Sequence, residues 1–158
     1  MRDATLCFLV KESNNKIIQI CLAKKKRGFG TDKWNGAGGK VMNETIEEAM
    51  IRETIEEIDV VPLEYVKVAE LTFQFKENPA FNQKVYSYLA TSWKGNPSES
   101  DEMKPRWFEV DEIPYYSMWD DDKHWLPLVL NKKKLTGKFL FNQKNKIIDH
   151  KINVVNKF

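Results

Sequence analysis

Residues 38–57 read GGKVMNETIEEAMIRETIEE, a glycine-rich loop that runs into a segment of charged and aliphatic residues. Thr45 followed by Glu48 has the pattern of a capping box, which starts a helix. Pro62 prevents the helix from continuing far past Ile58 and favours an extended backbone at Val61. The stretch therefore predicts a loop followed by a helix over about residues 45–58, and the rest of the chain is interpreted from it.

This helix would have two chemically different faces. At 100° per residue, Glu53, Glu56 and Glu57 fall on one face, and the isoleucines of the segment fall on the other. Taken alone, an acidic face is most often solvated, here with an Arg52–Glu56 ion pair worth about 0.3–0.5 kcal/mol. Three like charges repel, however, and a cation would neutralise them. Carboxylate oxygens suit Mg²⁺, which also binds substrate phosphates.

The composition is that of an ordinary globular protein. The chain has 158 residues, with 25 basic and 23 acidic side chains and a net charge of +2. At this length we expect a single domain, residues 1–158, whose hydrophobic core is stable without disulfides or structural metal ions. The charge balance argues against a dedicated nucleic-acid coat protein. No apolar run approaches the roughly 20 residues that a membrane helix needs.

Cys7 and Cys21 both lie in apolar runs and form neither a disulfide framework nor a zinc-binding spacing. We expect them to be buried thiols in a reducing compartment. Asp3 and Glu12 interrupt the first apolar run, which is atypical of a signal peptide. The sequence therefore indicates an intracellular protein.

Extended segments dominate the remainder of the chain. Two β-rich runs, residues 4–10 and 16–23, flank a polar turn at residues 12–15. Further extended runs are expected at residues 65–75, 84–91, 106–110, 139–141 and 147–155, and a second helix at residues 121–130. Several strands around one strong helix predict an α+β fold, a mixed sheet with helices packed on it.

The glycine-rich loop fits neither common nucleotide-binding fingerprint, because Val41 follows Lys40 and the glycine spacing is wrong for a dinucleotide site. Counted from Gly38, the spacing instead resembles the Nudix box of the MutT/Nudix hydrolases, G-x5-E-x7-R-E-U-x-E-E-x-G-U, where U is a bulky aliphatic residue. The matching residues are Gly38, Glu44, Arg52, Glu53, Glu56, Glu57 and Val60. Thr54 and Asp59 depart from the pattern, since an aliphatic residue and glycine are usual there. If Gly39 is the motif glycine instead, the loop to Glu44 is one residue short.

The resemblance extends over nearly the whole chain to the eukaryotic MutT-homologue branch of oxidised purine nucleoside triphosphatases, or 8-oxo-dGTPases. The supporting segments are residues 25–30, 34–36, 99–103, 107–108, 118–119 and 125–127. The branch implies a Nudix fold, an α/β/α sandwich around a mixed sheet. It also implies Mg²⁺-dependent hydrolysis of oxidised purine nucleoside triphosphates, such as 8-oxo-dGTP and 2-oxo-dATP, to the monophosphate and pyrophosphate. Such an activity keeps mutagenic nucleotides out of DNA.

The resemblance assigns a catalytic and metal-binding set. Glu53, Glu56 and Glu57 would be metal ligands, one of them also placing the water, and the carbonyl of Gly38 would add an oxygen. Arg52 would orient the carboxylates. Glu102 matches a further metal-linked acid, although a surface glutamate in an acidic turn is the alternative. The implied cofactor is Mg²⁺, for which Mn²⁺ can substitute.

A second set would bind the rest of the nucleotide. Asn35, Asp121 and Asp122 are implied to hydrogen-bond the purine edge, and Phe29, Phe73 and Trp119 to enclose or stack on the ring. The remaining substrate-binding candidates are Thr5, Lys25, Gly38, Gly39 and Lys40. Lys25 would meet the phosphates, although the basic run at residues 24–27 could equally be a solvated strand end or a targeting patch.

Two adjacent buried carboxylates should not ionise together easily, so the pKa of one would rise. A protonated Asp donates a hydrogen bond and an ionised Asp accepts one, so a proton shared by Asp121 and Asp122 would let one pocket bind more than one oxidised purine. The alternative for residues 120–122 is an acidic helix N-terminus. Trp107 and Trp125 are expected in the core. Asn82 lies near a position where relatives offer the base an apolar contact.

Two other functions stay open at this point. One is a Nudix hydrolase of a different nucleotide, namely an alkylated purine triphosphate, an RNA cap or a dinucleoside polyphosphate. The other is a non-enzymatic nucleotide-binding module. In each case we expect a cytoplasmic monomer that binds a small nucleotide, with no nucleic-acid polymer and no membrane as partner. A nuclear or mitochondrial pool is left open.

Overall fold

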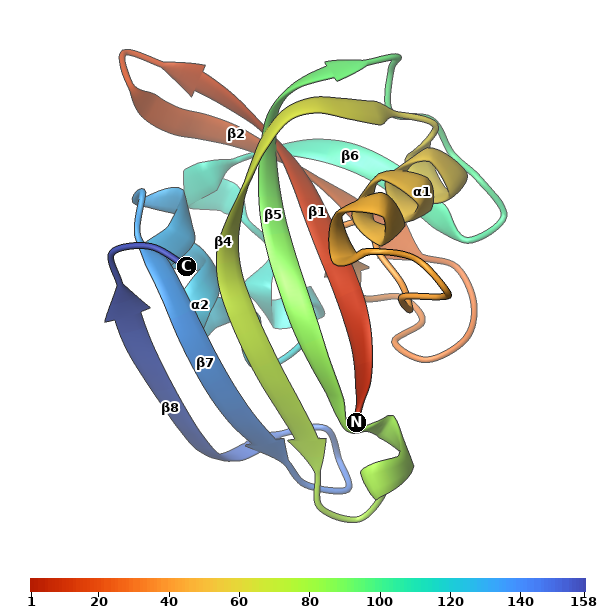
Figure 1. Cartoon of the computed structure of the whole chain (residues 1–158), viewed down its shortest axis with the longest axis vertical. Coiled ribbons are helices and arrows are strands. Elements are labelled where there is room, and N and C mark those ends of the chain that lie inside the picture. Colours follow the sequence, from red (N-terminus) through yellow and green to blue (C-terminus); the bar gives the residue numbers. More distant parts are fainter.

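The computed structural model describes residues 1–158 and is built around one eight-stranded sheet (Figure 1). The strands are β1 (Arg2–Ser13), β2 (Lys16–Lys25), β3 (Trp34–Asn35), β4 (Val61–Phe75), β5 (Gln83–Lys94), β6 (Met103–Glu109), β7 (Lys134–Phe141) and β8 (Ile147–Val155). The helices are α1 (Ile46–Ile58) and α2 (Asp122–Leu130), with short 3₁₀ turns η1 (Pro79–Phe81), η2 (Val110–Glu112) and η3 (Tyr115–Ser117).

The sheet is mixed. Its strand order is β3-β2-β1-β5-β4-β7-β8, with β6 paired to β2. The β1–β5 and β4–β7 pairs are parallel, and the other pairs are antiparallel. This arrangement confirms the predicted α+β class and the mixed sheet.

The two helices cover opposite faces of this sheet. Met50 and Ile58 of α1 pack with Cys7 and Leu9, and Trp125 of α2 packs in a larger cluster on the other face. Side chains alternate along β1, so its odd-numbered residues 5–9 face α1 and its even-numbered residues 4–10 face α2. The predicted sandwich is confirmed, and β1 lies between its two layers.

Local sequence accounts for most element boundaries. The capping box is present, because Glu48 N–H donates to Thr45 Oγ1 and Thr45 N–H donates to Glu48 Oε1, each at 3.1 Å. The first hairpin turns at Asn14 and Asn15, both with positive φ, as a tight two-residue hairpin requires. Helix α1 ends at Asp59, whose φ of 59° is left-handed, a conformation that favours glycine. Asp59 therefore takes up the strained position that the motif leaves to glycine.

All the predicted strands and both helices are present, but β1, β2, β4, β5 and β7 are longer than predicted, and β6 begins and ends earlier, at Met103 and Glu109. The short β3 was not predicted, because a two-residue strand has no periodicity to detect. Cys7 and Cys21 are buried free thiols, and burial raises the pKa of each to about 12. Neither α1 nor α2 has the length and apolar content needed to cross a bilayer.

Candidate active site

Arg52 joins helix α1 to the glycine-rich loop. Its guanidinium donates to both oxygens of Glu44 at 2.6–3.1 Å, to Glu53 Oε1 at 2.8 Å and to Glu56 Oε2 at 3.2 Å. It also donates to the carbonyl of Lys40 at 3.1 Å. A planar guanidinium suits this task because its five N–H groups form a fixed fork. Arg52 therefore binds Glu44, Glu53 and Glu56 in one network.

The glycine-rich loop passes so close to its neighbours that side chains are excluded. A Cβ at Gly38 would overlap the Thr5 carbonyl oxygen, and one at Gly39 would lie 2.6 Å from the Glu53 carboxyl carbon. The Gly38 N–H donates to Glu57 Oε1 at 2.7 Å. Gly38 therefore requires glycine because backbone atoms block a side chain there, whereas a Cβ at Gly39 would have to displace the Glu53 carboxylate. Gly38 also directly contacts the acidic face.

Glu57 is the most buried carboxylate of that face, with 7% of its surface exposed. Burial raises the pKa of Glu57 to about 7, and the nearby charges of Glu53 and Glu102 act in the same direction. The Gly38 N–H and the charge of Lys25 oppose this shift. When Glu57 is ionised, the Gly38 N–H and the charge of Lys25 compensate its negative charge only in part.

The carboxylates do not converge on one point, since no three acidic, His or Cys side chains are gathered tightly enough to hold a metal ion. Glu53 and Glu56 are turned toward Arg52, and Glu102 is bound by Arg27 at 2.7–2.8 Å. The donor chemistry nevertheless fits a hard divalent cation, because the charges of Glu53 and Glu102 act on the buried Glu57 and all three offer carboxylate oxygens.

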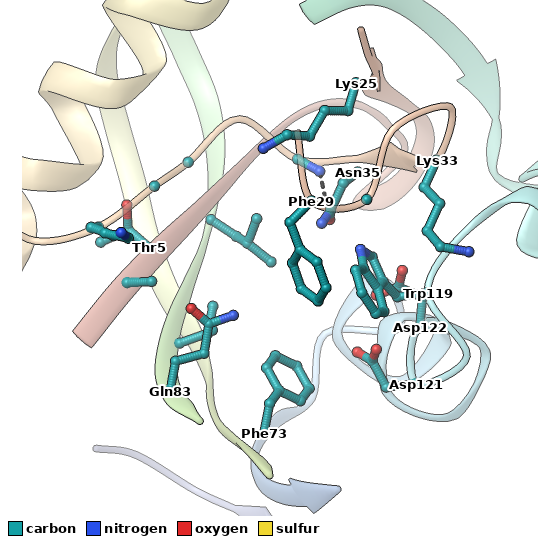
Figure 2. A pocket seen from close by; sticks show the side chains of 18 of the residues that line it. Thr5, Lys25, Phe29, Lys33, Asn35, Phe73, Gln83, Trp119, Asp121 and Asp122 are labelled. Carbon is teal, nitrogen blue, oxygen red and sulfur yellow. Dashed lines mark hydrogen bonds between the residues drawn. The ribbon is translucent and has the colours of Figure 1, made fainter. Parts of the chain in front are cut away.

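A cavity of about 260 Å³ opens beside Glu57, on the side of the sheet that α2 covers. All eleven predicted substrate-binding residues line it: Thr5, Lys25, Phe29, Asn35, Gly38, Gly39, Lys40, Phe73, Trp119, Asp121 and Asp122 (Figure 2). Of the predicted catalytic residues, only Glu57 reaches the cavity wall. The structure therefore places the two predicted sets next to each other, with Glu57 between them.

Asp121 and Asp122 form a buried pair at the start of α2, with 3% and 2% of their surfaces exposed. Asp121 Oδ2 accepts from Trp125 Nε1 at 2.7 Å, whereas Asp122 Oδ2 has no hydrogen-bond partner. Burial raises the pKa of Asp121 to about 6, and burial together with the charge of Asp121 raises the pKa of Asp122. Burial thus favours the protonated form of this pair.

Aromatic side chains enclose the cavity. Phe29 and Trp119 have ring centroids 4.9 Å apart with a 46° tilt, and Phe29 stacks on Phe81 at 4.5 Å. A base stacked between two rings needs those rings about 7 Å apart. This is twice the spacing of about 3.4 Å between neighbouring stacked bases along one DNA strand. Phe29 and Trp119 can thus cover one side of a purine but cannot sandwich it between them without moving.

The structure refines several predictions. Thr5 lines the cavity, but strand alternation points its side chain toward α1, and its buried Oγ1 has no partner. Trp125 lies in the core as expected and also holds Asp121. Asn82 does not line the cavity, because its side-chain oxygen accepts from Phe75 N–H at 2.7 Å. Its neighbour Gln83 lines the cavity instead.

Sequence reasoning missed Arg2, Lys33 and Gln83, which also line the cavity. Arg2 and Gln83 are cross-strand partners in the parallel β1–β5 pair, and Lys33 lies over the Trp119 ring at 5.4 Å. Side-chain alternation along β1 and β5 would have identified Arg2 and Gln83 if the register between the two strands had been known. A parallel register between distant strands cannot be deduced from one sequence.

The fold, the glycine-rich loop and the glutamate helix define a class of protein. The NUDIX domain profile matches residues 1–129, and the chain belongs to the Nudix family. In fold it is similar to the MutT protein of Bacillus halodurans, with a TM-score of 0.82 and 24% identity over 97% of this chain and 98% of that one.

Two animal relatives are more similar in sequence. Both are named oxidized purine nucleoside triphosphate hydrolase. The zebrafish (Danio rerio) protein is 43% identical over 87% of this chain and 88% of its own length. The mouse (Mus musculus) protein is 40% identical over 89% of this chain and 90% of its own length.

Proposed function

We propose that this Nudix hydrolase cleaves oxidised purine nucleoside triphosphates, of the 8-oxo-dGTP and 2-oxo-dATP type, to the monophosphate and pyrophosphate. The observation that carries the proposal is the single cavity in which Asp121, Asp122 and Asn35 lie close to the glycine-rich loop and Glu57. The names of the zebrafish and mouse relatives support the same substrate class.

The base would be held at the inner end of the cavity. Asp122 has an unpartnered buried oxygen, so a hydrogen-bonding purine edge would relieve its desolvation. With one proton shared between Asp121 and Asp122, this wall can present one donor and several acceptors. Moving that proton would let the same wall bind both 8-oxoguanine and 2-oxoadenine edges.

The triphosphate would extend from there along Gly38, Gly39 and Lys40 toward helix α1. Lys25 lies on the same wall and contributes positive charge to Glu57 and to phosphate oxygens. Water would attack phosphorus, the P–O bond to the pyrophosphate group would break, and the monophosphate would remain at the base site. Nearby carboxylates favour this step by positioning the water and accepting its proton.

Nudix hydrolases generally use divalent metal ions, and we propose Mg²⁺ here, with Mn²⁺ able to substitute. Glu53, Glu56 and Glu57 would hold the ion, with the Gly38 carbonyl and Glu102 as further oxygen ligands. A bound divalent ion neutralises phosphate charge and lowers the pKa of a coordinated water. Arg52 would hold the carboxylates in position while they change from arginine to metal contacts.

We propose a monomer. A nucleotide-sanitising enzyme acts on free triphosphates, and we propose the cytoplasm as its main location. We propose that residues 1–158 form one domain.

The proposal is tested by pyrophosphate release from 8-oxo-dGTP, 2-oxo-dATP, O6-methyl-dGTP and dGTP at sub-saturating concentration, with Mg²⁺ and after chelation. A strong, Mg²⁺-dependent preference for the oxidised purines is the expected result. A preference for O6-methyl-dGTP would replace the substrate class, and binding without any release would replace the enzyme with a nucleotide-binding module.

The catalytic assignment has a separate test in Glu57→Gln. This change removes the buried charge at nearly constant volume, and we expect turnover to fall by at least about 100-fold. Thermal stability at pH 8 should be retained or increased, since an ionised buried Glu57 is costly. Glu64→Gln, on the exposed part of β4, is the matched control and should leave turnover unchanged. Near-normal turnover of Glu57→Gln would remove Glu57 from the mechanism.

A further inference from the structure

Gln83 is a polar residue on the cavity wall formed by β1, β4 and β5, where Arg2, Phe73 and Val85 also line the cavity. It is the first residue of β5, and its register partners are Arg2 in β1 and Phe73 in β4. Two residues further along β5, Val85 lines the same cavity, so strand alternation points both side chains to the same face. Figure 2 shows the carboxamide of Gln83 entering the cavity from the side opposite Asp121 and Asp122.

The carboxamide of Gln83 makes no hydrogen bond within the protein, although the residue is half-buried. A half-buried amide with no partner in the protein can exchange its water for a ligand in the cavity. The neighbouring Asn82 is different, because its side-chain oxygen binds Phe75 N–H and fixes the turn before β5. Asn82 therefore stabilises the turn, and the Gln83 carboxamide remains free to bind a ligand in the cavity.

A carboxamide presents an N–H donor and a carbonyl acceptor side by side. A purine oxidised at C8 carries N7–H and C8=O side by side, which is the complementary pair. An unmodified purine has an acceptor at N7 and a carbon-bound hydrogen at C8, so it offers a carboxamide no such pair. A purine oxidised at C2 has the same unmodified imidazole edge.

We propose that Gln83 recognises the N7–H and C8=O groups of 8-oxopurines directly, through two hydrogen bonds from its carboxamide. This inference rests on the proposed function and assigns a specificity-determining residue to it. A purine's pyrimidine edge and imidazole edge face in different directions, so Asp121 and Asp122 can bind the first while Gln83 binds the second. The acid pair then selects among oxidised purines in general, and Gln83 favours those oxidised at C8.

The test compares Gln83→Met, which keeps the length of the side chain and removes its polar pair, with Gln74→Met. Gln74 lies in β4 between Phe73 and Phe75, points to the other face and does not line the cavity. The readout is kcat/KM for 8-oxo-dGTP divided by kcat/KM for 2-oxo-dATP. Gln83→Met should lower this ratio by about 10-fold, the discrimination typical of one bidentate contact to a base. Gln74→Met should leave it unchanged.

A second measurement avoids catalysis altogether. Without added metal, calorimetric titration with 8-oxo-dGMP and dGMP gives an affinity ratio, which Gln83→Met should also lower by about 10-fold. Gln83→Glu serves as a second variant should Gln83→Met fail to fold. It loses both N–H donors and places negative charge toward C8=O, so it should lower the same ratios.

Unchanged ratios in a folded Gln83 variant would overturn the inference while leaving the hydrolase proposal intact. Wild-type protein that does not hydrolyse 8-oxo-dGTP would instead overturn the proposed function. In that case the affinity ratio for the monophosphates still decides whether Gln83 contacts the oxidised edge.

Discussion

At the scale of single residues, buried carboxyls stand at both ends of the cavity. Burial raises the pKa of Glu57 to about 7 and the pKa of Asp121 to about 6. Each ionised group therefore costs free energy in the empty protein. A cation would relieve the cost at Glu57, and a purine edge would relieve it at Asp121 and Asp122, so both costs favour ligand binding over the ligand-free state.

The acid pair gives a pH dependence of stability with a definite sign. The pKa of Asp121 is higher in the folded protein, at about 6, than the ordinary 3.8, so the folded state binds more protons between these values. The free energy of unfolding must then fall as pH rises from about 4 to 6, by up to about 3 kcal/mol for a shift of this size. Asp122→Asn removes one charge of the pair, and we expect it to stabilise the protein more at pH 8 than at pH 4.

Urea denaturation of wild type and Asp122→Asn at pH 4, 6 and 8 checks this prediction. Asp120→Asn is the control, because the pKa of Asp120 is lowered by its hydrogen bonds from Ile147 N–H and Lys123, and its loss should destabilise the protein at pH 8. An Asp122→Asn difference that shrinks as pH rises would contradict the assignment of a protonated pair.

Asp59 provides a second prediction at this scale. Its left-handed φ of 59° costs an ordinary residue about 1–2 kcal/mol, and glycine avoids this cost. Asp59→Gly should therefore raise the free energy of unfolding by about 0.5–1 kcal/mol, after the greater flexibility of glycine in the unfolded chain is subtracted. Asp111→Gly, in η2 with ordinary φ, is the control and should lower it. Chemical denaturation measures both, and a loss of stability in Asp59→Gly would rule out strain at this cap.

At the scale of elements, helix α1 is held to the glycine-rich loop chiefly by one side chain. Arg52 reaches Glu44 and the Lys40 carbonyl in the loop, and Glu53 and Glu56 on its own helix. The loop and the acidic face are therefore positioned together. Movement of either one would displace Gly38 from Glu57.

Arg52→Lys tests this coupling. A lysine keeps the positive charge but cannot bind Glu44, Glu53 and the loop carbonyl at the same time. We expect turnover to fall about 10- to 100-fold, the usual effect of losing a group that orients metal ligands. Arg106→Lys on β6 is the matched control and should retain turnover in the same pyrophosphate assay. Full activity in Arg52→Lys would mean that the carboxylates need no such support.

The elements also show what the sequence could predict. Helix α1 was predictable because capping, periodicity and motif spacing agree on it, and the long strands were predictable from their β-rich runs. The two-residue β3 was not, because it exists only by pairing with β2. Arg2 and Gln83 were missed for a related reason: they enter the site through the parallel β1–β5 register, which is set by the packing of the whole sheet. Asn82 and Gln83 are adjacent, but Asn82 accepts a hydrogen bond from Phe75 N–H, whereas Gln83 begins β5 and lines the cavity.

At the scale of the whole molecule, one sheet separates two layers with different tasks. Helix α1 covers one face and α2 covers the other (Figure 1), and Glu57 of α1 reaches the cavity that Asp121 and Asp122 also line. The strands β1 and β5 contribute residues to both hydrophobic clusters. Neither layer has a core that is independent of the central strands.

This shared sheet predicts cooperative unfolding. The five tryptophans are distributed over both faces, so their fluorescence reports on both layers, and far-UV circular dichroism reports on the sheet and helices. We expect the two signals to give superimposable urea transitions with one midpoint, as in a two-state protein. A separate, earlier fluorescence transition would show that one layer unfolds by itself and would contradict the single-domain proposal.

The placement of β1 between the layers has a further consequence for how such a protein can change over generations. Most of the proposed metal-binding residues sit on α1 and its loop, whereas the proposed base-binding residues sit on β3, β4, β5 and the start of α2. Mutations that alter the preferred nucleobase can therefore accumulate without disturbing the hydrolytic chemistry. Proteins that inherit this architecture can acquire new damaged-nucleotide substrates while they keep the same hydrolysis reaction.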